Sequence, residues 1–296
     1  TIWVCRALLN ELPNDRDALK RLSDALQLLG NKGELVDVLE AYLKVAPTPR
    51  EKLGLHRQIA KISEDNADLA RTVSHLERAV RICPPGPESE EVLCELARVY
   101  GLQGRTELAV QTLELCQKQN PRAGAELQRL LGRLTQESED ATLLDKSVRA
   151  FRELLSRVPD DAEALASLQR LYRRRGEWAE LKAVLERQLA TNDPPLPLRD
   201  RLSVALELSE VYSEHLKDPR EAAALIERVQ AQTPIVDLRA HRRLRVLYEE
   251  LGEYSKAARY AERELLLTED PVARMERAFD IATMWQSRAR DNDRAL

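Results

Sequence analysis

The sequence contains few of the residues around which enzymes and membrane proteins are usually built. Only 10 of its 296 residues are glycine, and Phe, Trp and Tyr together make up 4%. It has no Gly-rich phosphate loop, no His-Glu-x-x-His, no Gly-x-Ser-x-Gly and no Cys-x-x-Cys, so we expect no catalysis, no cofactor and no metal site. Its apolar runs are short and interrupted by charges, whereas a membrane-spanning helix needs ~20 apolar residues. We therefore expect no membrane insertion by this segment.

The chain also lacks an excess of positive charge. It has 46 basic against 50 acidic residues, a net charge of −4, and this balance gives no long-range attraction to a phosphate backbone. Nucleic acid is therefore not an expected partner. Leucine, alanine, glutamate and arginine are abundant and strand formers are scarce, which is typical of an all-α protein.

Cysteine and histidine are equally sparse, with four of each, and neither set has the close spacing of a disulfide framework or a metal site. Cys94 and Cys116 fall on the two helices of one predicted hairpin, with Cys83 just before it. We interpret them as buried free thiols, with a redox or zinc site as the alternative. This cysteine usage favours a reducing, cytoplasmic location. We interpret His56 and His75, on neighbouring predicted helices, as surface or packing residues.

Prolines recur along the whole chain at intervals of 34 to 40 residues. A repeat of this length is typical of a solenoid, in which one small unit is copied and stacked. Proline has no amide hydrogen and disfavours helical geometry in the residue before it, so each proline is expected to mark the end of a unit. The set consists of Pro13, Pro47, Pro84, Pro121, Pro159, Pro194, Pro234 and Pro271.

The clearest copy of the unit runs from Ala162 to Pro194. Its apolar residues recur at helical spacing, are interrupted by Gly176 and then resume, which predicts a helical hairpin closed by a glycine in the left-handed conformation. Asp160 or Asp161 supplies an oxygen that caps the first helix. The apolar positions are Leu165, Leu168, Leu171, Tyr172, Trp178, Leu181, Val184, Leu185 and Leu189.

The same order of residues recurs in two other segments, and there the chain resembles the tetratricopeptide repeat family, although Leu181 stands where that family prefers Ala. The resemblance covers essentially the whole chain. It implies an all-α, right-handed α-solenoid (superhelix) of antiparallel helical hairpins, with a concave groove lined by the first helix, helix A, of each hairpin. The residues that carry it are Leu93, Leu96, Ala97, Tyr100, Gly104, Ala109, Leu113 and Pro121, and then Leu244, Tyr248, Gly252, Tyr254, Ala257, Ala261 and Pro271.

We expect one solenoid over residues 1–296. Residues 1–13 are predicted to be the second helix, helix B, of a hairpin whose helix A is missing, and residues 272–296 a partial repeat. Trp3 and Val4 near one end, with Met284 and Trp285 near the other, favour either a longer protein, of bacterial composition, or self-association through uncapped ends. Seven full repeats are expected, at 14–47, 48–84, 85–121, 122–159, 160–194, 195–234 and 235–271.

Two kinds of turn alternate, which predicts a copied unit of two hairpins. One kind has a glycine at the turn, and the other has an aspartate that caps helix B. Asp140 is the alternative to Asp145 in one of them. The glycines are Gly33, Gly104, Gly176 and Gly252, and the aspartates are Asp68, Asp145, Asp218 and Asp291.

Aromatic residues recur at two positions of the unit, and we interpret both sets as packing residues, not as ligand cages. Trp178 and Tyr254 are placed in the first turn of helix B. The second set lies near the end of helix A and consists of Tyr100, Tyr172, Tyr212, Tyr248 and Trp285.

Arginine supplies the candidate binding residues, because guanidinium groups match carboxylates in a bidentate manner. The family resemblance places six arginines on or near the helix A groove, which predicts an acidic peptide or a chain terminus as ligand. The alternative is that arginines pair with neighbouring carboxylates such as Glu163, Glu177 and Glu249. No groove asparagine matches the carboxylate clamp of the family, which argues against a reader of chaperone tails. The six candidates are Arg98, Arg170, Arg173, Arg174, Arg239 and Arg242.

These observations favour a scaffold that binds a protein or peptide along its concave surface, because stacked hairpins give a large surface and no enclosed pocket. Two alternatives stay open. One is an RNA-binding helical repeat array, which needs basic groove residues and base-contacting side chains. The other is a purely structural or oligomerisation segment of a larger protein.

Overall fold

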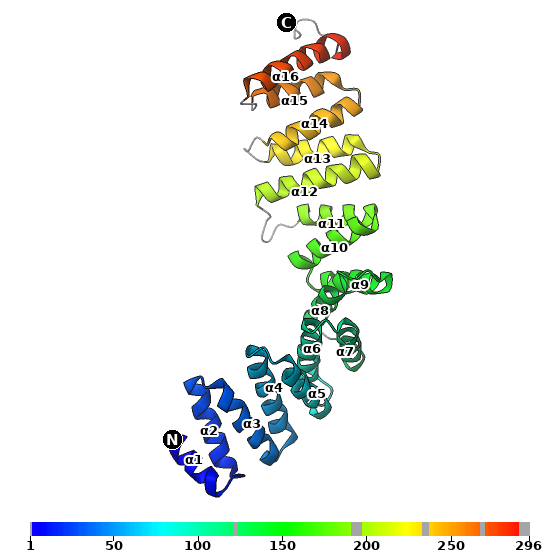
Figure 1. Cartoon of the computed structure of the whole chain (residues 1–296). Coiled ribbons are helices and arrows are strands. Elements are labelled where there is room, and N and C mark those ends of the chain that lie inside the picture. The colour runs from blue at the N-terminus through cyan, green and yellow to red at the C-terminus, as the bar shows by residue number, and fades with distance from the viewer. Residues whose placement is uncertain (1, 121–123, 191–196, 233–236, 267–269, 290–296) are drawn as a thin grey trace. The chain divides into compact units, whose positions relative to one another are not determined.

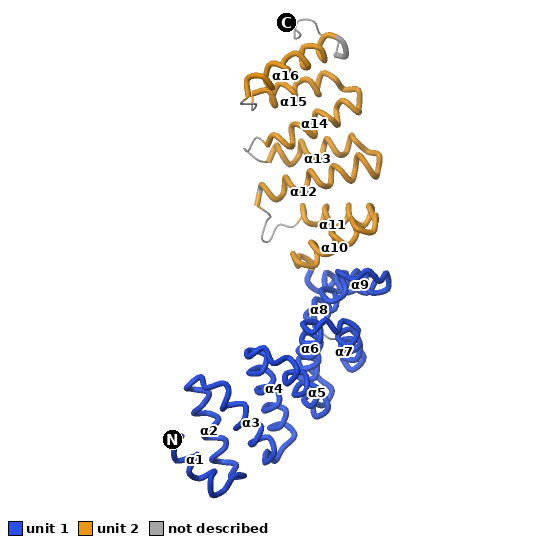
Figure 2. The backbone as a smooth tube through the Cα atoms, in the orientation of Figure 1, with its two compact units in different colours: residues 1–158 blue, residues 159–296 orange. Residues whose placement is uncertain are grey.

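The computed structural model of the chain describes residues 2–120, 124–190, 197–232, 237–266 and 270–289. Over these ranges it contains sixteen α-helices, two short π-helical turns and no strand, so the chain is an all-α solenoid. Contacts between Cα atoms divide it into two compact units, residues 1–158 and 159–296 (Figure 2). Each unit is a row of antiparallel helices in which every helix packs on the next (Figure 1).

The first unit holds nine helices within its described residues. The first of them, α1 (Ile2–Glu11), packs on α2 as a single helix, and the other eight form four hairpins. The hairpins are α2 (Arg16–Leu29) with α3 (Lys32–Val45), α4 (Pro49–Asp65) with α5 (Leu69–Ile82), α6 (Pro87–Leu102) with α7 (Thr106–Gln119), and α8 (Ala125–Thr135) with α9 (Ala141–Arg157).

The second unit repeats this arrangement. In two of its repeats helix A ends in a π-helical turn, and the second of these is the last described element of the unit. The hairpins are α10 (Ala162–Arg175) with α11 (Trp178–Ala190), α12 (Leu198–Glu210) and η1 (Val211–His215) with α13 (Pro219–Ala231), and α14 (Leu238–Glu250) with α15 (Tyr254–Leu266), followed by α16 (Pro271–Thr283) and η2 (Met284–Ala289).

The helices begin where the sequence offers a capping oxygen. The Asp161 carboxylate accepts the Ala164 amide hydrogen at 2.9 Å and begins α10, so Asp161, and not Asp160, is the N-cap. Such a cap stabilises a helix by ~1 kcal/mol. The family resemblance set Pro271 at the close of a repeat, but Pro271 is the first residue of α16, where its missing amide hydrogen is harmless. Pro13, Pro47, Pro84 and Pro159 lie between helices, and Pro121, Pro194 and Pro234 lie outside the described residues.

The glycine turns follow the prediction at three of four positions. Gly176 has φ +69°, and its amide and that of Glu177 donate to the carbonyls of Arg173 and Tyr172, so the glycine closes a Schellman motif. The prediction for Gly33 was wrong, because Gly33 lies inside α3. The preceding helix, α2, ends at Leu29, where Gly30 follows with φ +71° and Asn31 caps α3. The turn glycines with positive φ are Gly30, Gly104, Gly176 and Gly252.

The aspartate turns hold a non-glycine residue in the left-handed conformation. Asp68 and Asp218 cap α5 and α13 as predicted, and the residues just before them, Ala67 and Lys217, have φ values of 60° and 58°. The prediction for Asp145 was wrong, since this residue lies inside α9, which Asp140 caps. Asp291 lies outside the described residues.

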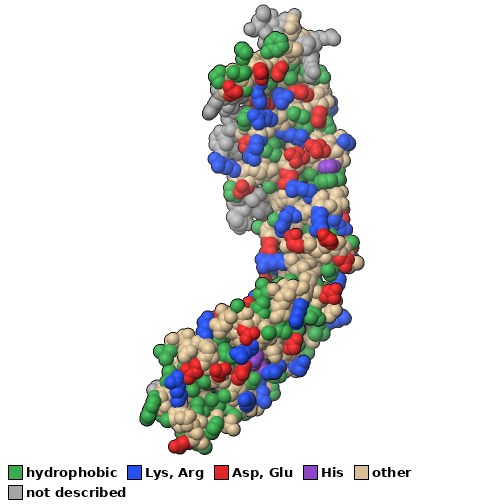
Figure 3. All heavy atoms as spheres, in the orientation of Figure 1, with side chains coloured by type: hydrophobic (Ala, Val, Ile, Leu, Met, Phe, Trp, Pro, Cys, Tyr) green, Lys and Arg blue, Asp and Glu red, His purple; other side chains and the backbone are tan. Residues whose placement is uncertain are grey.

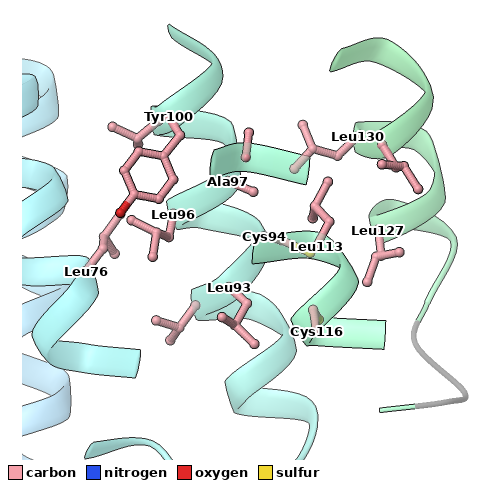
Figure 4. Close-up of a cluster of buried hydrophobic side chains, with 14 of the residues drawn as sticks. Leu76, Leu93, Cys94, Leu96, Ala97, Tyr100, Leu113, Cys116, Leu127 and Leu130 are labelled. Carbon is pink, nitrogen blue, oxygen red and sulfur yellow. The ribbon is translucent and has the colours of Figure 1, made fainter. Parts of the chain in front are cut away.

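Leucine and cysteine side chains pack between the helices of the first unit. Figure 4 shows Leu93, Cys94 and Leu113 meeting between neighbouring helices, and Leu113 and Cys116 are fully buried. The hydrogen bond with Cys116 and burial raise the pKa of the Cys94 thiol, so this thiol stays protonated and acts as an apolar group. The free cysteines of the structure are Cys5, Cys83, Cys94 and Cys116.

Recurrent aromatic residues join successive hairpins. The Tyr100 hydroxyl of α6 donates to the Glu77 carboxylate of α5 at 2.7 Å, and burial followed by this hydrogen bond raises the pKa of Tyr100 to about 12. The predicted packing role of these aromatic residues is thus combined with a hydrogen bond to the preceding hairpin. The same contact recurs from Tyr212 to Glu186, from Tyr248 to Glu227, and from the Trp285 indole to Glu262.

Candidate functional site

The candidate site is a pocket of about 610 Å³ on the second unit, formed by three successive helix A elements, α10, α12 and α14. We call it the basic pocket. Its apolar lining comes from the half-buried side chains of Leu206 and Val246. The complete lining consists of Arg173, Ser203, Leu206, Glu207, Glu210, Arg239, Arg242, Arg243 and Val246.

Four arginines and two glutamates make up the charged lining, and the arginines differ in how firmly they are held. Arg173 forms an ion pair with Glu207, one helix A further along the chain. Arg243 is mostly buried, with 18% of its side chain exposed. Its guanidinium contacts the Ser209 carbonyl at 3.4 Å and the Ser213 hydroxyl of η1. Arg173 and Arg243 therefore link neighbouring hairpins.

Arg239 and Arg242 project more freely. Arg239 pairs with Asp237 at 2.9 Å with 63% of its side chain exposed, and its hydrogen bonds hold the pKa of the Asp237 carboxyl below the usual value. Arg242 lies 3.8 Å from the Glu264 carboxylate with 50% of its side chain exposed. That distance is too long for a hydrogen bond, so the contact holds the Arg242 guanidinium only weakly.

The Glu264 carboxylate is buried and is held by two other arginines. Its side chain is only 2% exposed, and Arg245 and Arg277 approach it at 3.2 and 2.7 Å. A buried carboxylate needs such partners, because desolvation otherwise makes its charge very costly. Since Glu264 keeps two other guanidinium partners, Arg242 can leave it without stranding a buried charge.

The structure brings three of the six predicted arginines, Arg173, Arg239 and Arg242, into one pocket. Arg170 and Arg174 lie on α10 outside its lining, where Arg170 is within 3.4 Å of the Ser167 hydroxyl and Arg174 is exposed. Arg98 belongs to the first unit, where its guanidinium donates two hydrogen bonds of 2.6 Å to the Glu64 carboxylate.

The sequence-based set left out the apolar residues and Arg243. Arg243 sits in the same cluster of basic residues as Arg239 and Arg242, so composition already pointed to it. Nothing in the sequence marked Leu206 and Val246 as different from other apolar residues of the repeats. Only the stacking of α12 on α14 brings these two side chains to one pocket.

Ion pairs also join successive repeats along the surface of each unit. Figure 3 shows basic and acidic side chains interspersed over the face of each unit. Exposed pairs of this kind stabilise by only ~0.2–1 kcal/mol each, so they orient side chains more than they hold the fold. Pairs of residues 33 to 35 positions apart are Arg16 with Glu51, Lys32 with Asp65, Arg57 with Glu91, Arg98 with Glu64, and Arg173 with Glu207.

The predicted alternative for the arginines also has examples. Glu177 pairs with Arg175 at 2.7 Å, and Glu249 pairs with Arg245 at 2.7 Å. Arg175 and Arg245 do not line the basic pocket. Each belongs to a basic cluster of the sequence, and the two clusters are Arg170, Arg173, Arg174 and Arg175 on α10, and Arg239, Arg242, Arg243 and Arg245 on α14. In each cluster, therefore, one arginine pairs with a nearby glutamate while at least one other lines the basic pocket.

The histidine pair of the first unit is buried. The Nδ1 atoms of His56 and His75 lie 3.0 Å apart between α4 and α5, and His75 Nε2 lies 3.6 Å from Glu40. Burial, followed by repulsion from His75, lowers the pKa of His56 to about 4. Within the described part of the chain no three His, Cys, Asp or Glu side chains gather as a metal site. None of its described helices combines the length and the hydropathy of a membrane span.

Comparison with known proteins identifies the repeats. Two family models, both described as tetratricopeptide repeat, match residues 164–198 and 240–271, and residues 90–122. No sequence among the curated proteins matches the chain.

Three solved structures are similar to the chain. A tetratricopeptide repeat protein from Parabacteroides merdae ATCC 43184 superposes with a TM-score of 0.50 at 16% identity, over 88% of this chain and 96% of its own. YrrB, described as a tetratricopeptide repeat protein with an unusual peptide-binding site, gives 0.47 at 11% identity over 77% and 97%. MamA gives 0.45 at 13% identity over 68% and 94%. The chain thus contains tetratricopeptide repeats at residues 90–122, 164–198 and 240–271, and the first of these structures shares its fold of stacked helical hairpins.

Proposed function

We propose that the chain is a non-catalytic scaffold whose basic pocket binds an acidic segment of a protein partner. Tetratricopeptide repeats support protein–protein interaction in general, because stacked hairpins present extended surfaces. The observation that carries the finer proposal is the meeting of Arg173, Arg239, Arg242 and Arg243 in one pocket of the second unit. Glu207 and Glu210 offset only part of that positive charge.

An acidic peptide fits this pocket better than a nucleic acid. The net charge of the chain is −4, and the acidic groups of the pocket and of the surrounding surface repel a continuous phosphate backbone. A short segment with a few carboxylates can instead contact individual guanidinium groups. We extend the same proposal to Arg170 and Arg174 on α10 and, as a separate contact in the first unit, to Arg98. We also propose one continuous solenoid and a cytoplasmic location.

Association of copies through the ends of the chain is a second candidate. It is favoured by exposed apolar side chains on α1 and α16, where Trp3 is 79% and Phe279 is 74% exposed. Sedimentation velocity across a hundredfold concentration range tests it. A sedimentation coefficient that does not change over that range contradicts it.

Fluorescence anisotropy with labelled peptides tests the main proposal. An acidic peptide should bind more tightly than a neutral or a basic peptide of equal length, and the double variant Arg239→Glu, Arg242→Glu should lose that preference while keeping its helical circular dichroism. The matched control is Arg228→Glu, because Arg228 is an exposed arginine on α13 outside the pocket. Equal loss in control and double variant would show a general charge effect and contradict the proposal. Tighter binding of a labelled RNA oligonucleotide, falling steeply with salt, would favour the RNA-binding alternative.

A further inference from the structure

We infer that the segment bound by the basic pocket carries an aliphatic side chain next to its carboxylates. This inference rests on the proposed function and specifies its ligand. The pocket is not uniformly charged, because Leu206 of α12 and Val246 of α14 line it together with the acidic and the basic groups. Both side chains are half-buried in the free protein, so each keeps apolar surface that a ligand can cover.

The charges are sorted between the two helices. The acidic lining residues, Glu207 and Glu210, belong to α12, whereas Arg239, Arg242 and Arg243 belong to α14. Carboxylates of a ligand are therefore attracted towards α14 and repelled from α12. A ligand that places an aliphatic group on Leu206 and Val246 satisfies this arrangement, because its carboxylates can then face α14 alone.

Two arginines of the pocket link neighbouring hairpins, and the other two are exposed enough to contact a ligand. Arg173 and Arg243 already link hairpins through Glu207 and through Ser209 and Ser213, so moving them costs contacts between repeats. Arg239 and Arg242 are 63% and 50% exposed, and their carboxylate partners, Asp237 and Glu264, are not among the residues that line the pocket. We assign the direct carboxylate contacts to Arg239 and Arg242.

The test is a double-mutant cycle between pocket and peptide. The probes are the fluorescein-labelled peptides Gly-Glu-Glu-Leu-Glu-Glu-Gly and its counterpart with Ala in place of Leu. For the full chain we expect the Leu peptide to bind about 10-fold more tightly, the lower end of the discrimination that one methylene group gives in an apolar site, because only Leu206 and Val246 form the apolar lining here. Leu206→Ala should reduce this preference to about 3-fold or less while leaving the affinity for the Ala peptide nearly unchanged.

A second variant and a control keep the outcomes distinct. Val246→Ala should lower the Leu preference in the same way, and it decides the matter if Leu206→Ala unfolds the hairpin by circular dichroism. Leu108→Ala changes an exposed leucine of the first unit, 42% exposed, and should leave the preference intact. Equal affinity for the two peptides, or a preference that survives both pocket variants, overturns the inference but leaves the proposed function standing. Failure of every acidic peptide to bind overturns both.

Discussion

Replacing Ala67 by glycine should stabilise the protein, although glycine normally weakens helical proteins. Ala67 follows α4 with φ 60°. Its amide donates to the Glu64 carbonyl and that of Asp68 to the Ser63 carbonyl, both at 2.8 Å. This is the same Schellman arrangement that Gly176 makes after α10. In the glycine turn the left-handed residue has no Cβ, whereas in the aspartate turn it has one.

The expected magnitude comes from two opposing terms. The left-handed conformation costs an L-residue with a Cβ roughly 1–2 kcal/mol. Glycine removes that cost but loses more backbone entropy on folding, which costs roughly 0.5–1 kcal/mol relative to alanine. Ala67→Gly should therefore raise the free energy of unfolding by about 0.5–1 kcal/mol. Lys217→Gly should act in the same direction, since Lys217 has φ 58°.

Urea unfolding followed by circular dichroism measures the change, and amide hydrogen exchange locates it in α4 and α5. Two matched substitutions set the scale. Ala224→Gly makes the same chemical change at an exposed interior position of α13 and should destabilise by ~1 kcal/mol. Gly176→Ala places a Cβ at φ +69° and should destabilise by a similar amount. The reasoning is refuted if Ala67→Gly destabilises as much as Ala224→Gly does.

Three further predictions concern the first unit. Tyr100→Phe removes the hydrogen bond to Glu77 and should lower the free energy of unfolding, measured in urea, by ~1.5 kcal/mol. This is the lower end of the range for a hydrogen bond to a charged group, because Glu77 is half-buried. No change would mean that this bond does not join α5 to α6. Gly132→Ala would place a Cβ within 2.8 Å of the Phe151 ring and should cost ~1–2 kcal/mol despite the better helix propensity of alanine, whereas a thermal midpoint above that of the native chain would contradict this packing. Burial lowers the pKa values of His56 and His75, so the neutral pair contributes stability above the unfolded pKa of 6.5, and this contribution is lost as pH falls towards 4. The native chain should therefore lose stability over this range more steeply than the His56→Gln variant does. Equal slopes would contradict a buried neutral pair.

Much of the fold could be predicted because its determinants are local. The positions of Gly176, Asp161 and Asp218 identify helix ends, since a left-handed glycine and a capping carboxylate act within one turn of chain. The error at Gly33 has the same origin. Two glycines lie close together there, and the choice depends on where Asn31 caps the next helix. At α9, two aspartates compete as caps, and Asp140 accepts the Thr142 amide hydrogen.

The candidate site was less accessible to prediction because its contacts join separate repeats. The partner of Arg98 is Glu64 and that of Arg173 is Glu207, both 34 residues away. Sequence spacing predicts pairing within a helix at three or four residues, and it does not show which surface arginine meets which glutamate of the next repeat. The apolar lining of the basic pocket depends on the stacking of successive helix A elements for the same reason.

The most direct test of the basic pocket as an acidic-peptide site is a charge swap. The double variant Arg239→Glu, Arg242→Glu is titrated by fluorescence anisotropy with the Glu-rich peptide and with its Lys-rich counterpart, Gly-Lys-Lys-Leu-Lys-Lys-Gly. We predict that the native chain prefers the Glu-rich peptide and that the variant prefers the Lys-rich one, because the aliphatic lining is unchanged and only the α14 side of the pocket reverses its charge. The same peptide preference in both proteins would contradict the site.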